Sequence, residues 1–382
     1  MTTDQVTDPG YELITEVEHL HYYLKQALKL EHATIPPYIT ALYSLKPGTN
    51  LEAFHIIRAV AVEEMLHLTL VANVLNAVGG DIKSTLTAPD FVPKYPAYIP
   101  TGSKDFQVDL RKFSPETVKA FMNIERADEP EEGKPLIVSR SVQEQCHFLT
   151  IHNGQPSNTF YGIGLFYSEI VRGLFALHKK MGSALFCGDP ERQITPQYYY
   201  NGGGDIIPVT DLRSAMRAIR VIQEQGEGSR PKTIYDAERE LAHYYRFRQL
   251  LPPDDGGKVG EGKYYVIDKD NPENSDSPDR PTGVSFKVDW DAVYPLKQNA
   301  SLSDYPQGTE VYAAAQEFES GYRQFLAKLE HAFDGHPEAL IPAVGGMFRL
   351  KEQANNLIRN PIDGVGGDHA APIFPVPPPV SP

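Results

Sequence analysis

Two side chains that could bind a metal lie on one face of a predicted helix. Glu64 and His67 are three residues apart, and at helical spacing they share a stripe with four valines. Those valines are Val60, Val71, Val74 and Val78. Burying an ionised carboxylate without a partner is very costly, so this stripe needs a compensating cation. Glu-x-x-His on a bundle helix is the arrangement of di-iron and di-manganese carboxylate proteins.

The same motif recurs in the second half of the chain, as Glu240-Leu241-Ala242-His243. We predict it on a long helix whose inward stripe also carries Thr233 and Phe247. One such motif is weak evidence, because chance matches are common. Two on separate apolar helical faces favour a di-metal bundle, which takes two Glu-x-x-His motifs and two further carboxylates.

Glu31 supplies the third carboxylate, in the apolar register of the preceding helix. Glu31 and Glu64 are 64 − 31 = 33 residues apart. This separation fits a helical hairpin in which the two residues lie at the same height along neighbouring helices. The sixth ligand has two candidates. Glu227 lies at a Gly-flanked helix end and Glu169 lies in the middle of a helix, and both remain open.

The predicted donor set contains carboxylates and imidazoles but no thiolate. Such a set suits iron or manganese better than a structural zinc site. We therefore predict two iron ions, with manganese as the alternative. Glu63, next to Glu64, is expected outside the ligand set, as is His32 beside Glu31.

The elements that must position these residues are helices. Apolar periodicity predicts seven main helices, with Pro36-Pro37 kinking or breaking the first and Gly79-Gly80 ending the second. Their approximate ranges are 11–43, 51–78, 162–181, 210–225, 233–251, 310–333 and 337–360. Ser114 and Pro115 predict a further short helix that ends at about residue 124.

We therefore predict an all-α four-helix bundle with additional helices and long loops. The bundle occupies residues 11–251, with a loop-rich insertion at about 81–160. Residues 252–382 form a loop, two C-terminal helices that pack on the bundle and a Pro-rich tail. A strand is expected at 263–267, and the long loops are expected to form lids and substrate walls.

Composition excludes several classes of protein. The formal net charge is −14 and no block of Lys or Arg occurs, so we expect no nucleic-acid partner and no membrane partner. The two cysteines, Cys146 and Cys187, form no disulfide framework. Without a signal peptide or an apolar run of ~18 residues, a cytoplasmic location is expected. The sequence leaves a homo-oligomer open.

Several motifs resemble the ferritin-like domain of the iminophenylpyruvate dimer synthase family, of the violacein and rebeccamycin pathway type. They are Leu30-Glu31-His32-Ala33-Thr34-Ile35-Pro36-Pro37-Tyr38, Val62-Glu63-Glu64-Met65-Leu66-His67-Leu68, Gln225-Gly226-Glu227-Gly228 and Glu240 to Phe247. The specific resemblance covers about residues 15–250 and extends more loosely through Trp290 to Phe374. It implies an all-α, ferritin-like bundle with the ligand set Glu31, Glu64, His67, Glu227, Glu240 and His243.

The resemblance also implies an activity in secondary metabolism, because characterised members oxidatively couple two imines derived from amino acids. We expect a non-haem di-iron oxidase or oxygenase, with O2 and a small amine- or amino-acid-derived metabolite as its substrates. No catalytic residue is predicted beyond the metal ligands. Two alternatives remain: a metal-binding protein of ferroxidase type without an organic substrate, and a non-catalytic pathway partner.

Overall fold

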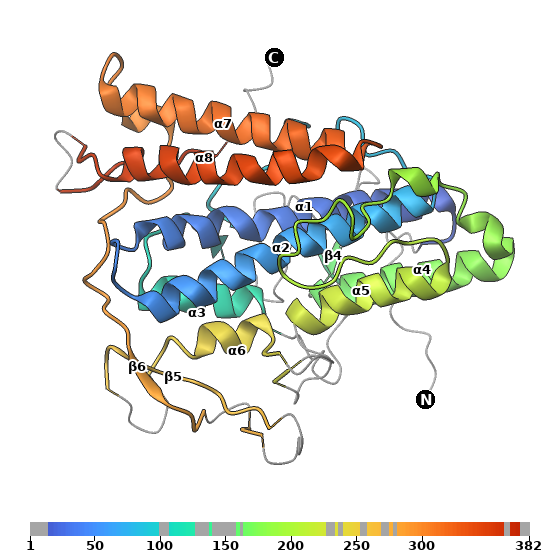
Figure 1. Cartoon of the computed structure of the whole chain (residues 1–382), viewed down its shortest axis with the longest axis horizontal. Coiled ribbons are helices and arrows are strands. Elements are labelled where there is room, and N and C mark those ends of the chain that lie inside the picture. The colour runs from blue at the N-terminus through green and yellow to red at the C-terminus, as the bar shows by residue number, and fades with distance from the viewer. Residues whose placement is uncertain are drawn as a thin grey trace.

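The computed structural model describes most of the chain and contains eight α-helices among the described residues (Figure 1). The described ranges are 14–98, 107–126, 137–139, 158–160, 163–226, 234–235, 240–252, 258–268, 275–277, 281–362 and 367–374. The fold is mainly helical, as predicted.

A long helical hairpin forms the centre of the molecule. Helices α1 (Val17–Ser44) and α2 (Leu51–Ala77) pack along each other and are buried over most of their length. The break after α2 is the one predicted, because Gly79 has a φ of +75°, which favours glycine.

Helices α4 (Ile163–Met181) and α5 (Leu212–Gly226) complete a four-helix bundle. Helix α4 packs against α1, α5 packs against α2, and α4 and α5 pack against each other. Each of the four helices thus contacts two others, which closes the ring of a bundle (Figure 1).

Of the kink or break predicted at the paired prolines, the structure contradicts the break. Pro36 and Pro37 lie inside the continuous helix. A proline at position 37 removes the N–H that would bond the Ala33 carbonyl. The Tyr95 hydroxyl donates to that carbonyl instead, at 2.6 Å. A side chain from outside the helix therefore satisfies an acceptor that the proline leaves open.

Two short helices cover one side of the hairpin. Helix α3 (Pro115–Ile124) begins as predicted, with the Ser114 hydroxyl accepting from the Thr117 N–H at 3.2 Å. It packs against α6 (His243–Arg248), and α6 also contacts α2. The predicted long helix at 233–251 is wrong, because within the described residues only these six form a helix.

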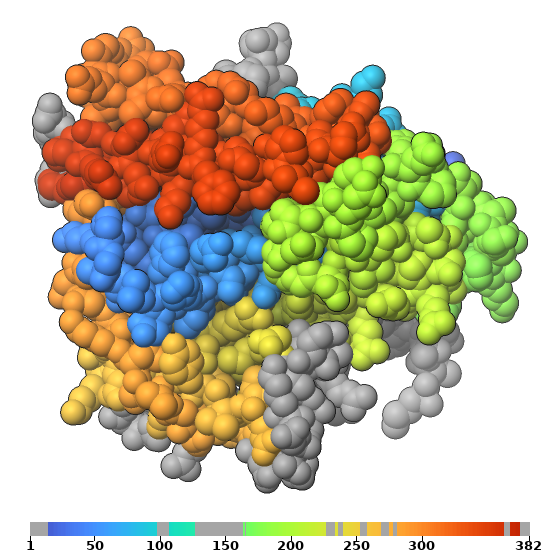
Figure 2. Space-filling model, viewed as in Figure 1, coloured from blue at the N-terminus to red at the C-terminus, as the bar shows by residue number. Residues whose placement is uncertain are grey.

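Helices α7 (Glu310–Phe333) and α8 (Leu340–Ile358) form a second hairpin, and both were predicted. They pack against each other, while α8 contacts α1 and α7 contacts α2. Figure 2 shows α8 lying over the N-terminal hairpin on one face of the molecule. No helix in the described part of the chain is both long and apolar enough to cross a membrane.

The remaining regular elements are short. In the described part of the chain, three antiparallel pairs of strands occur, and 3-10 turns lie between the helices. The pairs are β1 (Ala97–Tyr98) with β2 (Gln107–Val108), β3 (Ile137–Ser139) with β4 (Asn158–Phe160), and β5 (Glu261–Lys263) with β6 (Ser285–Lys287). The 3-10 turns are Gly182–Leu185, Pro190–Arg192, Leu302–Asp304 and Pro337–Ala339. The strand expected at 263–267 therefore begins and ends earlier, at β5.

Candidate metal centre

The first cluster joins α1 to α2. Glu31, Glu64 and His67 are all buried, and one possible ligand atom from each lies within 4.8 Å of the others. The His67 Nδ1 atom lies 3.2 Å from Glu31 Oε2 and 3.9 Å from Glu64 Oε2. The helical hairpin therefore brings these three side chains together, as the spacing of the sequence predicted.

The second cluster adds two elements from distant parts of the chain. Glu64, Glu125 and His243 are buried, and their nearest ligand atoms also lie within 4.8 Å of one another. Glu125 follows the last residue of α3, and His243 is the first residue of α6. The His243 Nδ1 atom lies 3.0 Å from Glu64 Oε1 and 3.4 Å from Glu125 Oε2.

Glu64 belongs to both clusters and faces them with different oxygens. Its Oε1 faces His243 and its Oε2 faces His67. The two imidazole rings are stacked with centroids 5.5 Å apart and planes inclined by 21°. If two metal ions were bound here, Glu64 could contribute one oxygen to each.

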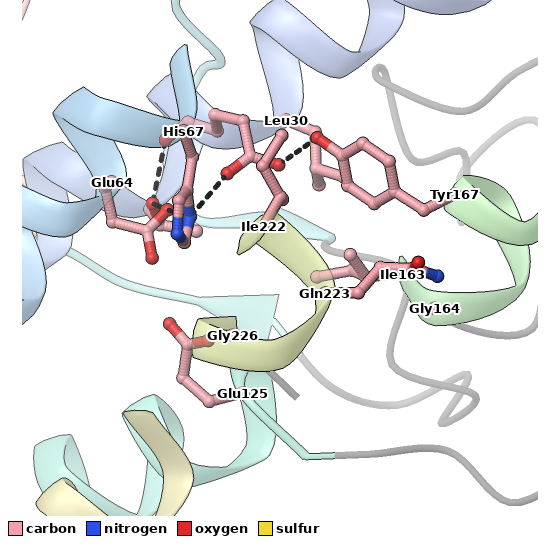
Figure 3. A pocket seen from close by; sticks show the side chains of 12 residues that line it. Leu30, Glu64, His67, Glu125, Ile163, Gly164, Tyr167, Ile222, Gln223 and Gly226 are labelled. Carbon is pink, nitrogen blue, oxygen red and sulfur yellow. Dashed lines mark hydrogen bonds and ion pairs between the residues drawn. The ribbon is translucent and has the colours of Figure 1, made fainter. Parts of the chain in front are cut away.

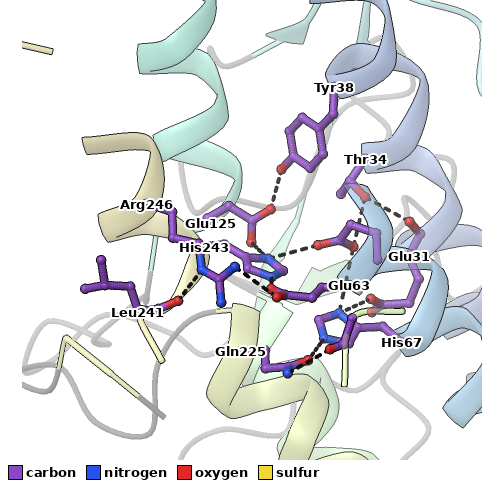
Figure 4. Close-up of polar contacts among 12 residues, drawn as sticks. Glu31, Thr34, Tyr38, Glu63, His67, Glu125, Gln225, Leu241, His243 and Arg246 are labelled. Carbon is purple, nitrogen blue, oxygen red and sulfur yellow. Dashed lines mark hydrogen bonds and ion pairs between the residues drawn. The ribbon is translucent and has the colours of Figure 1, made fainter. Parts of the chain in front are cut away.

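The Nε2 atoms of both histidines, which face away from Glu64, are hydrogen-bonded (Figure 4). His243 Nε2 donates to Glu63 Oε2 at 2.8 Å, and Arg246 Nη1 lies 2.9 Å from the other oxygen of Glu63. His67 Nε2 donates to Gln225 Oε1 at 2.9 Å. Each ring is thereby oriented with Nδ1 toward the centre.

Hydroxyl groups hold the carboxylates. Tyr167 donates to Glu31, and Tyr38 donates to Glu125. The Thr34 hydroxyl lies 3.0 Å from Glu64 Oε2 and 2.8 Å from the Glu31 backbone carbonyl. Each of the three buried carboxylates thus has a hydroxyl partner, which restrains its rotation.

The metal-free centre retains protons. Burial, followed by the charge of Glu125, raises the pKa of Glu64 to about 7. Burial by itself lowers the pKa of His243, but the carboxylates of Glu125, Glu63 and Glu64 raise it well above 6.5. The pKa of His67 is also raised, because Glu31 and Glu64 outweigh the effect of burial. Protons therefore neutralise part of the buried negative charge.

The donor set fits divalent iron or manganese. The buried Nδ1 atom of His243 has no hydrogen-bond partner, although two carboxylate oxygens lie close to it. A buried polar atom without a hydrogen bond is costly, and a metal ion coordinated by this nitrogen and those oxygens would remove that cost. Oxygen and imidazole donors without thiolate suit iron and manganese.

The structure separates the predicted ligands into two groups. It brings Glu31, Glu64, His67 and His243 together. Glu240 is exposed and precedes α6, so it does not share a helical face with His243, and the structure does not bring it together with the other predicted ligands.

The two candidates for the sixth ligand have different outcomes. Glu169 points away from the clusters: it accepts from the Ile14 N–H at 2.8 Å and pairs with Arg172 at 2.6 Å. The structure therefore does not bring Glu169 together with the other predicted ligands. Glu227 lies outside the described residues.

Sequence analysis missed Glu125. Helix α3 buries Val118 and Phe121, and Glu125 follows Phe121 by four residues, on the same face. Its carboxylate is therefore directed inward like those of Glu31 and Glu64. A search for acidic residues in register with buried apolar ones would have found this signal at the helix end.

A small cavity opens beside the centre, between α1, α4 and α5 (Figure 3). Its volume is about 30 Å³. Glu31, Glu64 and His67 contribute its polar wall, and Ile163 and Ile222 contribute part of its apolar wall. A site of ~10–15 Å³ on this measure holds one water, so this cavity accommodates only very small molecules.

Comparisons with known proteins agree with this architecture. The family model described as Ferritin-like matches residues 24–252. A ferritin-like protein from Caulobacter vibrioides, solved as a crystal structure, superposes with a TM-score of 0.57 at 18% identity. The alignment covers 95% of this chain and 100% of that one, and at this identity it shows the fold alone. No curated protein matches the sequence. The match over residues 24–252, more than half of the chain, shows that this protein belongs to the Ferritin-like family.

Proposed function

We propose that the chain is a non-haem di-iron protein that uses O2 to oxidise a small amine- or amino-acid-derived metabolite. The observation that carries the proposal is Glu64, whose two oxygens face two different histidines in a buried site. A carboxylate oriented in this way could bind two adjacent metal ions, one through each oxygen. Glu31 with His67 would hold one ion, and Glu125 with His243 would hold the other.

Two ferrous ions at this centre would supply the electrons for the reduction of O2. The protein's own residues would set the geometry. Tyr167 and Tyr38 hold the outer carboxylates, and the imidazoles are fixed by their Nε2 partners. The cavity beside His67 gives a molecule the size of O2 a place next to the centre, and Ile163 and Ile222 form part of its apolar wall.

Within this class, we propose a reaction similar to that of iminophenylpyruvate dimer synthase. The support is the motif resemblance around Glu31 and Glu64. The reaction would be an oxidative coupling, in which two imines lose two electrons and two protons as one bond forms between them, and O2 takes up both electrons and both protons to become H2O2. Candidate substrates are therefore imines derived from aromatic amino acids.

The size of the cavity favours a second candidate, a ferroxidase without an organic substrate. A volume of about 30 Å³ accommodates O2 or water but no amino-acid derivative. Oxidation of ferrous ions by O2 needs no larger space. The two candidates share the same ligands and differ only in what they oxidise.

Metal analysis of anaerobically prepared protein tests the site itself. We expect two equivalents of iron in the wild type and one or none in Glu125→Ala. Glu240→Ala is the matched control and should retain both, because Glu240 is exposed. Full retention in Glu125→Ala with loss in Glu240→Ala would contradict the proposed ligand set.

Oxygen consumption then separates the two functions. With the iron-loaded protein, an oxidase should consume O2 in stoichiometric proportion to an added aromatic imine. A ferroxidase should respond to ferrous iron alone and ignore the imine. Consumption that Glu64→Ala leaves unchanged would show that the reaction occurs elsewhere.

A further inference from the structure

We propose that the two metal positions are unequal and that Glu63, held by Arg246, makes the position beside His243 the tighter one. The inference rests on the proposed function, since it concerns the same centre. It assigns a role to two residues, Glu63 and Arg246, that are not ligands. In this proposal both are positioning residues and act only through His243.

The two histidines are presented in the same way. Each directs Nδ1 at Glu64 and uses Nε2 for a hydrogen bond to the surrounding protein. Their partner carboxylates, Glu31 and Glu125, are also alike, because each accepts from a tyrosine. Each of the two metal positions would therefore have the same kinds of ligand, one imidazole Nδ1 and one tyrosine-bound carboxylate.

The outer partners are not alike. His243 donates to the carboxylate of Glu63 at 2.8 Å, whereas His67 donates to the neutral amide of Gln225 at 2.9 Å. A hydrogen bond to a carboxylate is charge-assisted and increases the electron density at the opposite ring nitrogen. Nδ1 of His243 is consequently the stronger donor, and the metal beside it is held more tightly.

Arg246 keeps Glu63 in place. Its Nη1 lies 2.9 Å from Glu63 Oε1, and its Nε donates to the Leu241 carbonyl at 2.6 Å. Only Oε2 of Glu63 then remains for His243. Since His243 and Arg246 are three residues apart on α6, one short helix carries both the ligand and the residue that restrains its partner.

The position of Glu63 in α2 fits this role. Successive helical residues point ~100° apart, so Glu63 and Glu64 cannot face the same point. Glu64 lies 3.0 Å from Nδ1 of His243. Glu63 lies 2.8 Å from Nε2, on the opposite side of the ring (Figure 4). Gln225 lacks such support: its amide donates to the Gly203 carbonyl at 3.3 Å, and no charge is involved.

Titration of the metal-free protein with Co²⁺ under anaerobic conditions tests the inference. Calorimetry gives the two affinities, and the absorption bands of Co²⁺ report the coordination of each ion. We expect two binding steps in the wild type, separated by about tenfold or more. Glu125→Ala should remove the tighter step, and Glu31→Ala should remove the weaker one.

Glu63→Gln should weaken the tighter step by about 10- to 100-fold and leave the weaker step within about threefold. Gln225→Glu is the converse variant and should strengthen the weaker step, so that the two affinities converge. Circular dichroism checks that each variant is folded. If Glu63→Gln does not fold, the affinity of the weaker step in Gln225→Glu is the test of the inference.

The outcomes separate this inference from the proposed function. Two equal steps in the wild type, or a Glu63→Gln effect on both steps alike, would overturn the inference and leave the di-metal site intact. An unchanged weaker step in Gln225→Glu would overturn it as well. Absence of Co²⁺ binding in the wild type would overturn both proposals.

Discussion

Glu31 and His32 show how neighbouring residues acquire different roles. Glu31 faces the centre, whereas the Nε2 atom of His32 lies 2.9 Å from the Tyr322 hydroxyl of α7. Burial lowers the pKa of His32 to about 3, so this ring remains neutral. His32 therefore ties the centre's helix to the C-terminal hairpin and contributes no charge to the site.

The protons in the centre predict how stability depends on pH. The folded-state pKa of Glu64 is raised from 4.5 to about 7, and those of His67 and His243 are raised above 6.5. The folded state therefore binds more protons than the unfolded state as pH rises through these values. Stability of the metal-free protein should decrease between about pH 5 and 8.

Thermal unfolding of the metal-free protein across this range measures the effect, and a decrease in Tm of several degrees is expected. Glu64→Gln should show a shallower slope, because one of the titrating groups is gone. The pKa of Glu63 is lowered from 4.5, so its contribution falls below this range. A Tm that rises from pH 5 to 8 in the metal-free wild type would contradict the prediction.

At the scale of the element, α6 differs most from expectation. The motif Glu240-x-x-His243 places both side chains on one face only if all four residues are helical. Ala242 instead has extended backbone angles, and its N–H donates to the Ile234 carbonyl at 3.1 Å. An isolated bridge between Tyr235 and Leu241 lies beside it. Because the backbone before His243 pairs with residues 234 and 235, α6 begins only at His243.

Helix α1 yields a second prediction. Tyr95→Phe removes the hydroxyl that donates to the Ala33 carbonyl, which Pro37 leaves without its helical N–H donor. Leaving this buried acceptor without a partner should cost about 1–3 kcal/mol of unfolding free energy. Chemical denaturation measures it. Tyr264→Phe, at a residue that is 39% exposed, is the control and should change little.

Across the whole molecule, the centre joins four elements. Its candidate ligand residues come from α1, α2, the end of α3 and the start of α6. Without a cation, Glu31, Glu64 and Glu125 place their carboxyl groups close together in a buried site. Metal binding is therefore expected to stabilise the entire bundle and not only the local helices.

Removal of metal by a chelator should lower Tm, and added Fe²⁺ should restore it. An ion present at 1,000 times its Kd stabilises the folded state by about 4 kcal/mol per site. Anaerobic thermal scans with and without metal measure the shift. Glu64→Ala should show little or none of it, whereas Glu240→Ala should behave like the wild type.

The sequence by itself determined the all-α fold and three members of the centre, Glu31, Glu64 and His67. These residues lie on adjacent helices joined by a short loop, so local periodicity was sufficient to place them on facing sides. His243 was identified for a reason that the structure does not support, since its presumed helical partner Glu240 is exposed.

Only the tertiary structure decided the other side of the centre. Glu125 is 61 residues from Glu64 (125 − 64), and His243 is a further 118 away (243 − 125). No local pattern relates residues at such separations, because their proximity depends on how α3 and α6 pack against the hairpin. The same packing places Glu63 beside Nε2 of His243 and leaves Glu240 exposed.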